Sequence, residues 1–173
     1  RGKTYYFKVC STAGRCSDEK ETGISSYQVK LDKTTPPAPT ITASDGITSG
    51  NWHKDNVTLT LSGANNISGN TYYYGETNNP TTAGSTIPTI STNTSSKTYY
   101  AKVCSGAGRC SDDLPNGISS YQVKLDKELP PPPTITVSDG KASGTWHTSD
   151  FTLTLSGANN ISGNTYYYGE TNI

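Results

Sequence analysis

The sequence predicts an all-β protein built of repeated two-sheet sandwiches, and three observations indicate this fold class. The chain of 173 residues repeats itself with a period of 94 residues and no insertion or deletion, so that residues 58–78 and 152–172 are identical. Short segments alternate apolar and polar residues, as half-buried strands do. No segment carries a helical period of useful length. Because the period exceeds the roughly 20–50 residues of solenoid repeats, each unit is long enough to bury a core of its own.

The complete copy of the unit, residues 40–127, contains the expected strands in a regular order. Alternation is strongest in residues 57–61 and 121–126, and residues 71–74 form an aromatic segment typical of strands. In chain order the expected strands are residues 40–43, 57–61, 71–74, 98–104 and 121–126. The side chains expected to face the core are Val57, Leu59, Leu61, Tyr99, Ala101, Val103, Tyr121, Val123 and Leu125.

The connections between these strands are rich in turn-forming residues. Asp45-Gly46 predicts a turn after the first strand, and residues 63–69, rich in Asn, Ser and Gly, predict a loop. Residues 78–96 contain two prolines and predict turns with one or two short edge strands. Six or seven short strands in about 90 residues are typical of a β-sandwich.

The repeat divides the chain into one complete unit, two partial units and two proline-rich linkers. The parts are residues 1–33 (the C-terminal part of one unit), 34–39 (linker), 40–127 (a complete unit), 128–133 (linker) and 134–173 (the N-terminal part of the next unit). Clustered prolines favour extended polyproline II and make semi-rigid spacers, so we expect a rod-like tandem array. The chain opens on Arg1 and contains no methionine. We therefore expect it to be part of a longer protein.

The partial units at the two ends predict contacts with neighbouring repeats. Residues 1–33 supply late strands of a unit and residues 134–173 supply early strands, so each part would expose strand edges and an apolar face. We expect these parts either to pair head-to-tail between neighbouring molecules or to be completed by a longer continuous chain.

Composition excludes several classes of partner. Acidic and basic residues balance at 14 each, and no basic patch or stripe is present, which argues against nucleic acid. No apolar run approaches the roughly 18 residues of a membrane helix, so no membrane insertion is expected in this part of the protein. Low charge combined with 12 tyrosines indicates a folded, all-β extracellular protein.

Three sequence elements point to a known family. They are residues 98–103 followed by Ala107-Gly108, residues 49–52 ahead of the strand at Val57, and residues 121–127 leading into prolines. Together they resemble the bacterial immunoglobulin-like (Big-type) repeats of secreted and cell-surface proteins, over essentially the whole chain. The resemblance implies an immunoglobulin-like β-sandwich that serves as a stalk, a spacer or a binding head. The cysteines depart from the cysteine-free loop that is common in such repeats.

Each unit contains two cysteines separated by five residues. The pairs are Cys10 with Cys16 and Cys104 with Cys110, and the intervening residues predict a turn that brings each pair together. Zinc sites usually pair closer cysteines with further ligands, and redox catalysis usually needs a Cys-x-x-Cys spacing. We therefore expect two local structural disulfides.

The histidines and the acidic loop residues indicate neither catalysis nor metal binding. His53 and His147 each follow a tryptophan, and one histidine per unit supplies neither a metal site nor a triad, so we expect a surface histidine beside a packed tryptophan. Carboxylates after the cysteines could hold calcium, but their spacing is not that of a recognised calcium loop, and we expect a solvated loop. They are Asp18, Glu19, Glu21, Asp112 and Asp113. No catalytic residue, metal or cofactor is expected.

Tyrosines form the one cluster with promise as a binding site. The candidates are Tyr72, Tyr73, Tyr74, Tyr99 and Tyr100. Alternation turns some of these rings outward, Tyr73 and Tyr100 among them, where aromatic faces can hold sugar rings or a protein partner. The alternative is that tyrosine is simply a good strand residue with a polar tip.

The function that these observations favour is structural. We expect tandem repeats of a large adhesin-like surface protein that hold a functional tip away from a bacterial cell, with no enzymatic activity in the chain. Alternatively, the repeats are themselves adhesive modules for a host glycan or protein, many weak sites gaining by avidity. A third interpretation is an accessory domain of a phage fibre or of a secreted enzyme.

Overall fold

The computed structural model describes residues 2–170, and this part of the chain is all-β. The strands, in chain order, are β1 (Gly2–Phe7), β2 (Ser25–Lys30), β3 (Thr40–Ala43), β4 (Trp52–His53), β5 (Val57–Ser62), β6 (Asn70–Gly75), β7 (Thr82–Ala83), β8 (Thr86–Ile90), β9 (Thr94–Ser105), β10 (Ser119–Leu125), β11 (Thr134–Val137) and β12 (Leu153–Ser156). Two short 3-10 turns, η1 (Ser17–Glu19) and η2 (Ser111–Asp113), follow the second cysteine of each pair. Among residues 2–170 no helix is long and apolar enough to cross a membrane.

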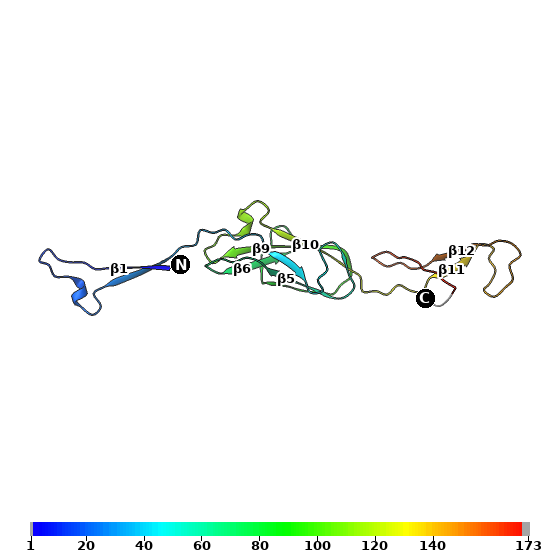
Figure 1. Ribbon diagram of the computed structural model, residues 1–173, viewed down its shortest axis with the longest axis horizontal. Helices are drawn as coiled ribbons and strands as arrows, with labels where there is room; N and C mark the ends of the chain where they lie inside the picture. Colours follow the sequence, from blue (N-terminus) through cyan, green and yellow to red (C-terminus); the bar gives the residue numbers. More distant parts are fainter. Residues whose placement is uncertain (1, 171–173) are drawn as a thin grey trace.

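Figure 1 shows three parts that follow one another along the longest axis of the molecule. Strands β1 and β2 form an antiparallel hairpin at one end, and β11 and β12 form another at the other end. Strands β3 to β10 form the central part, which contains a five-stranded sheet (β4-β10-β9-β6-β7) and a three-stranded sheet (β3-β5-β8). Neighbouring strands are antiparallel except β4 and β10, which are parallel.

The core of the central part draws residues from both sheets. It consists of Val57, Leu59, Leu61, Ile87, Ile90, Tyr99, Ala101, Tyr121, Val123 and Leu125, with Ile41, Ala43, Tyr72 and Tyr74 packed against it. Every second residue is buried in β5, in β9 from Tyr99 onward and in β10 from Tyr121 onward, as the alternation of the sequence predicts, because successive side chains of a strand point to opposite faces. One or two short edge strands were expected within residues 78–96, and the structure has two there, β7 and β8.

The terminal hairpins expose the faces that are buried in the central part. Tyr27 on β2 is 68% exposed, whereas its repeat equivalent Tyr121 is 4% exposed. On β12, Leu153 is 56% exposed, whereas its equivalent Leu59 is 0% exposed. The same sequence therefore presents a buried face in one place and an apolar surface in another.

The linkers are extended and have no regular secondary structure. The first linker nevertheless packs against the central part, since Pro36 and Pro39 are both buried. The hydroxyl of Ser119 at the start of β10 donates a hydrogen bond to the carbonyl oxygen of Pro39. The end of this linker is thus fixed to the unit that follows it.

Candidate functional site

Both pairs of cysteines are joined by disulfide bonds in the structure. The Cα atoms of Cys104 and Cys110 are 3.9 Å apart, as are those of Cys10 and Cys16. In the loop between Cys104 and Cys110, the backbone N–H of Ser105 donates to the carbonyl of Arg109 at 2.7 Å. Gly108 closes the turn with a φ of 84°, a left-handed conformation that favours glycine. The turn brings the two cysteines together, as the sequence predicts.

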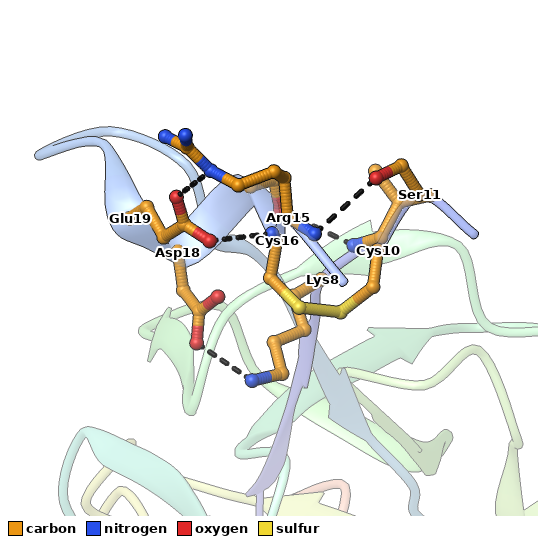
Figure 2. The surroundings of a disulfide bond; sticks show 9 residues. Lys8, Cys10, Ser11, Arg15, Cys16, Asp18 and Glu19 are labelled. Carbon is orange, nitrogen blue, oxygen red and sulfur yellow. Dashed lines mark hydrogen bonds and ion pairs between the residues drawn. A yellow bond between two sulfur atoms is a disulfide. The ribbon is translucent and has the colours of Figure 1, made fainter. Parts of the chain in front are cut away.

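The acidic residues after the cysteines are bound by the protein itself. Figure 2 shows the first copy, where Lys8 Nζ lies 2.7 Å from Asp18 Oδ2 and Glu19 accepts a hydrogen bond from the backbone N–H of Cys16 at 2.9 Å. In the second copy, Lys102 Nζ lies 2.8 Å from Asp112 Oδ2. The hydrogen bond from Lys8 lowers the pKa of Asp18. These carboxylates therefore hold the disulfide loop and the 3-10 turn together.

No metal centre is formed by these or other side chains in the described part of the chain. Within residues 2–170, no group of three or more His, Cys, Asp or Glu side chains is placed to hold a metal ion. The acidic loop was expected to be a solvated loop. Its ion pairs with lysines additionally connect it to the segment that precedes the first cysteine of each pair.

A serine opens each 3-10 turn and binds the backbone eight residues earlier, a contact that the sequence did not indicate; it is buried in the second copy and half-buried in the first. Ser111 is fully buried, and its Oγ accepts a hydrogen bond from the backbone N–H of Val103 at 3.1 Å. Ser17 makes the equivalent contact with Val9 at 3.2 Å. In both copies the serine is followed by two acidic residues, which are typical of the first turn of a helix, but the residue before the turn is a cysteine and the pattern does not point to the hydrogen bond of the serine.

The five candidate tyrosines lie on two different faces of the five-stranded sheet. Tyr72, Tyr74 and Tyr99 face the core, with Tyr99 itself part of the core cluster. Tyr73 and Tyr100 lie on the outer face and are half-buried. Tyr73 pairs with Lys102, two residues from Tyr100, so the two outer tyrosines are diagonal neighbours.

The outer face thus carries two adjacent aromatic rings among polar side chains. Of the five candidate tyrosines, only Tyr73 and Tyr100 remain as a candidate binding site, because the rings of the other three pack against the core. Neighbouring outward positions on the same strands are held by Lys102, Ser120 and Gln122. Aromatic rings beside such polar groups can stack on apolar faces while the neighbours accept and donate hydrogen bonds.

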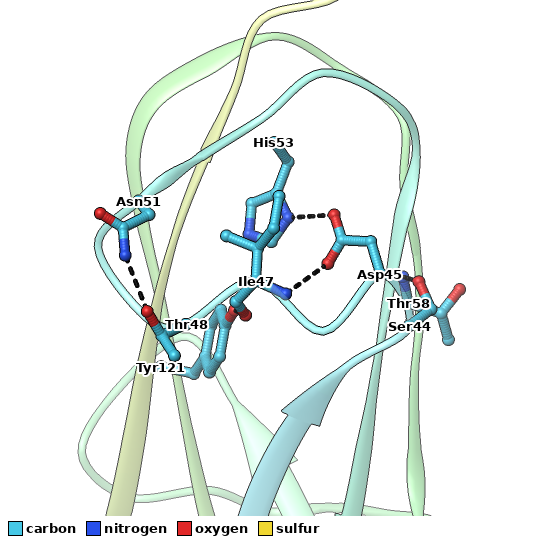
Figure 3. A network of polar contacts seen from close by, with 8 residues as sticks. All are labelled: Ser44, Asp45, Ile47, Thr48, Asn51, His53, Thr58 and Tyr121. Atoms are coloured by element: carbon cyan, nitrogen blue, oxygen red, sulfur yellow. Dashed lines mark hydrogen bonds and ion pairs between the residues drawn. The ribbon is translucent and has the colours of Figure 1, made fainter.

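His53 is buried, and the expectation of a surface histidine was wrong. Its side chain is 1% exposed, and Nδ1 lies 2.7 Å from Asp45 Oδ2 (Figure 3). The other oxygen of Asp45 accepts a hydrogen bond from the backbone N–H of Ile47 at 3.1 Å. The hydroxyl of Tyr121 donates to the carbonyl oxygen of the same Ile47. The histidine therefore anchors a polar network that closes one end of the core.

Electrostatics within this network follow from burial and hydrogen bonding. Partial burial would raise the pKa of Asp45, but the hydrogen bonds from His53 and Ile47 outweigh it and lower the pKa. Burial and the nearby charge of Asp45 raise the pKa of Tyr121. Within residues 2–170, His53 Nε2 is a buried side-chain nitrogen without a hydrogen-bond partner. The carboxylate thus holds the imidazole by one nitrogen only.

The same pair recurs in the C-terminal copy. His147 Nδ1 lies 2.7 Å from Asp139 Oδ2, although this histidine is only half-buried. The tryptophans were expected to be packed, but Trp52 is half-buried and Trp146 is 93% exposed. The Asp–His pair is therefore a local feature of the unit that forms even where the core around it is open. In comparisons with known proteins, no family model and no curated protein matches the chain.

Proposed function

We propose that the chain is a stretch of tandem immunoglobulin-like repeats that act as a stalk of a bacterial extracellular surface protein. The observation that carries the proposal is that one unit encloses its own core between two sheets, while copies of its parts continue along the same axis at both ends (Figure 1). A series of units that each bury a core and meet end to end can span distance without needing a ligand. As a stalk, the chain would need no catalytic residue.

The disulfides favour an extracellular location for the stalk. Disulfides persist in oxidising compartments, and each unit carries one in a surface loop. The extended linkers add to the length, because proline-rich segments rise by about 3.1 Å per residue. Attachment to a cell envelope and a functional tip belong to the same proposal and rest on the resemblance of the repeats.

The proposed stalk can be tested by measuring how the length of the molecule grows with the number of copies. The chain as it stands would be compared by small-angle X-ray scattering with a longer chain that carries one further 94-residue copy. A stalk should grow in maximum dimension by about 30–45 Å per copy, from strands at about 3.3 Å per residue plus linker. A maximum dimension that stays constant while the molecule thickens would contradict the proposal.

A second candidate function is adhesion by the units themselves, and the outer tyrosines favour it. Tyr73 and Tyr100 form adjacent half-buried rings on a polar sheet face, and an array of units would repeat that face in series. Weak sites in series gain by avidity, so binding to a glycan or protein surface should rise steeply with copy number.

Glycan arrays and cell-binding assays test this second candidate. The double variant Tyr73→Ala, Tyr100→Ala should abolish a signal that the unaltered chain gives. Thr60→Ala, an exposed position on β5 in the other sheet, is the control and should leave the signal unchanged. Unchanged binding by the tyrosine variant would leave the stalk as the better account.

A further inference from the structure

The same contact recurs at both junctions between successive parts of the chain. Beyond the end of β2, Asp32 Oδ2 accepts a hydrogen bond of 2.6 Å from Ser68 Oγ, which lies in the loop before β6. Beyond the end of β10, Asp126 Oδ2 accepts a hydrogen bond of 2.5 Å from Ser162 Oγ and one of 3.2 Å from its backbone N–H. Each aspartate lies 36 residues before its serine. The contact thus repeats with the period of the sequence.

Each aspartate also shapes the linker that it begins. Asp32 Oδ1 accepts a hydrogen bond from the backbone N–H of Thr34 at 3.0 Å, and Asp126 Oδ1 accepts one from Glu128 at 3.1 Å. This is an Asx turn, in which an aspartate side chain binds the backbone two residues on. One carboxylate therefore ties together the end of a strand, the start of the linker and a loop of the next unit.

The loop that receives Asp32 is itself fixed within its own unit. The backbone N–H of Gly106 donates to the carbonyl of Gly69 at 3.0 Å. A Cβ at Gly106 would lie 2.2 Å from the carbonyl oxygen of Ser68, so the two loops touch backbone to backbone. Because Ser68 cannot move without displacing the disulfide loop, an aspartate bound to it is held at a defined position relative to the unit.

A hollow at the first junction brings the two partners together. Its lining comes from Lys30, Leu31 and Asp32 on one side and from Ile67, Ser68, Gly106 and Ala107 on the other, with Gly2 at the edge. At the second junction, Asn160 adds a hydrogen bond of 2.7 Å from its side chain to the carbonyl of Glu128. The two linkers differ in sequence, yet the aspartate and the serine are common to both.

The charge of the aspartates fits their role as acceptors. The hydrogen bond from Ser68, followed by that from the Thr34 backbone, lowers the pKa of Asp32. The hydrogen bond from Ser162 is the largest cause that lowers the pKa of Asp126. Both side chains are therefore anionic acceptors at neutral pH, the form that makes the stronger hydrogen bond.

We propose that the loop of residues 65–69 and its repeat equivalent, residues 159–163, form an inter-unit docking surface whose partner is the aspartate that ends the preceding unit. The Asp–Ser contact acts as a latch that fixes the angle between successive units. This inference deepens the proposed stalk, because a latched junction makes the array stiff where a bare linker would let it bend.

Distances across each junction test the latch in the full chain. Nitroxide labels would be placed at the equivalent exposed positions Ser26→Cys and Ser120→Cys for the first junction, and Thr60→Cys and Thr154→Cys for the second. Pulsed electron paramagnetic resonance then gives the distribution of inter-label distances, and intact mass confirms that both native disulfides are retained. We expect a narrow distribution in the unaltered background.

Removal of the latch should broaden that distribution. Asp32→Ala should raise the population of undocked conformers about fivefold at the first junction only, because a hydrogen bond of this kind shifts an equilibrium by about that factor. Asp126→Ala should do the same at the second junction only. Asp55→Ala, which alters an exposed aspartate with no side-chain hydrogen bond within residues 2–170, is the matched control and should change neither distribution.

A double-mutant comparison separates the latch from a general loss of structure. Ser68→Ala should broaden the first distribution as much as Asp32→Ala, and the double variant should add little to either. An unchanged distribution in both single variants, additive broadening in the double variant, or equal broadening by Asp55→Ala would each overturn the latch. If the latch fails while the scattering length still grows with copy number, the proposed stalk stands without it.

Discussion

Leu59 and Leu153 offer a test of where the stability of this molecule resides. They occupy equivalent positions within the identical stretches of the two copies. Leu59 is fully buried in the central core, whereas Leu153 is 56% exposed on the C-terminal hairpin. We expect Leu59→Ala to destabilise the central part strongly and Leu153→Ala to leave it almost unchanged. The second variant is a control of the same chemistry in the same local sequence.

The expected magnitudes follow from burial. Replacing a buried leucine by alanine removes apolar contacts and leaves a cavity, which costs about 2–5 kcal/mol, and we take about 3 kcal/mol for Leu59. A domain of this size loses about 4–8 °C of melting temperature per kcal/mol, so the transition should fall by about 12–24 °C. An exposed substitution changes stability by about 0.5 kcal/mol or less, which corresponds to less than about 4 °C.

Thermal unfolding followed by circular dichroism and by tryptophan fluorescence provides the assay. Trp52 lies in β4 of the central part and reports on the same transition as the backbone signal. Equal losses in the two variants would mean that the face carrying Leu153 is covered in solution. A negligible loss for Leu59→Ala would mean that the two sheets do not enclose the core described above. Either result would refute the reasoning.

The remaining predictions concern the disulfide, a close backbone approach and acid stability. Replacing both Cys104 and Cys110 by serine opens a loop with a sequence separation of 6. The chain-entropy relation gives a loss of about 2 kcal/mol in the free energy of unfolding, which urea denaturation in non-reducing buffer would measure. An unchanged denaturation midpoint would contradict this prediction. Gly117→Ala would place a Cβ 1.6 Å from the carbonyl oxygen of Ser111. We therefore expect the free energy of unfolding to fall by about 3 kcal/mol, or no folded protein at all. A normal melting temperature would show that the turn is placed differently. Because the folded-state pKa of Asp45 lies below its ordinary value, the stability that this carboxylate contributes is present above about pH 4 and is lost as the pH falls through the folded-state pKa. The melting temperature of the unaltered chain should therefore fall further between about pH 6 and about pH 3 than that of Asp45→Asn, and parallel curves would count against the network.

Local alternation in the sequence predicts much of the core correctly. The buried faces of β5, β9 and β10 follow from a period of two, which is a property of any extended backbone. The same rule separates the outer rings of Tyr73 and Tyr100 from the packed tyrosines. Such predictions succeed because each depends only on neighbouring residues in the chain.

Features that depend on contacts between distant segments could not be predicted in this way. His53 is buried because β4 pairs with β10, about 70 residues further along the chain, and because Asp45 supplies a partner for its imidazole. The spacing of Asp45 and His53 does recur in Asp139 and His147, but that signal does not reveal which partner strand covers the ring. Burial of Pro36 likewise depends on how the linker meets the next unit.

The parallel pairing of β4 with β10 has a consequence for how the molecule bears mechanical load. The chain enters the central part at β3, which pairs with β5, and leaves it after β10. Tension on the two ends therefore loads β3 first and, once β3 is pulled away, draws the β4 segment and β10 in opposite directions along their length. The hydrogen bonds between them, including Gly50 N–H to the carbonyl of Gln122 at 2.9 Å and Asp126 N–H to that of His53 at 3.0 Å, then carry force together in shear. Bonds loaded in shear must break as a group, whereas a hairpin pulled from its open end loses them one at a time. Because resistance to pulling is governed by the unfolding rate, we expect this geometry to slow the unfolding of the central part under tension.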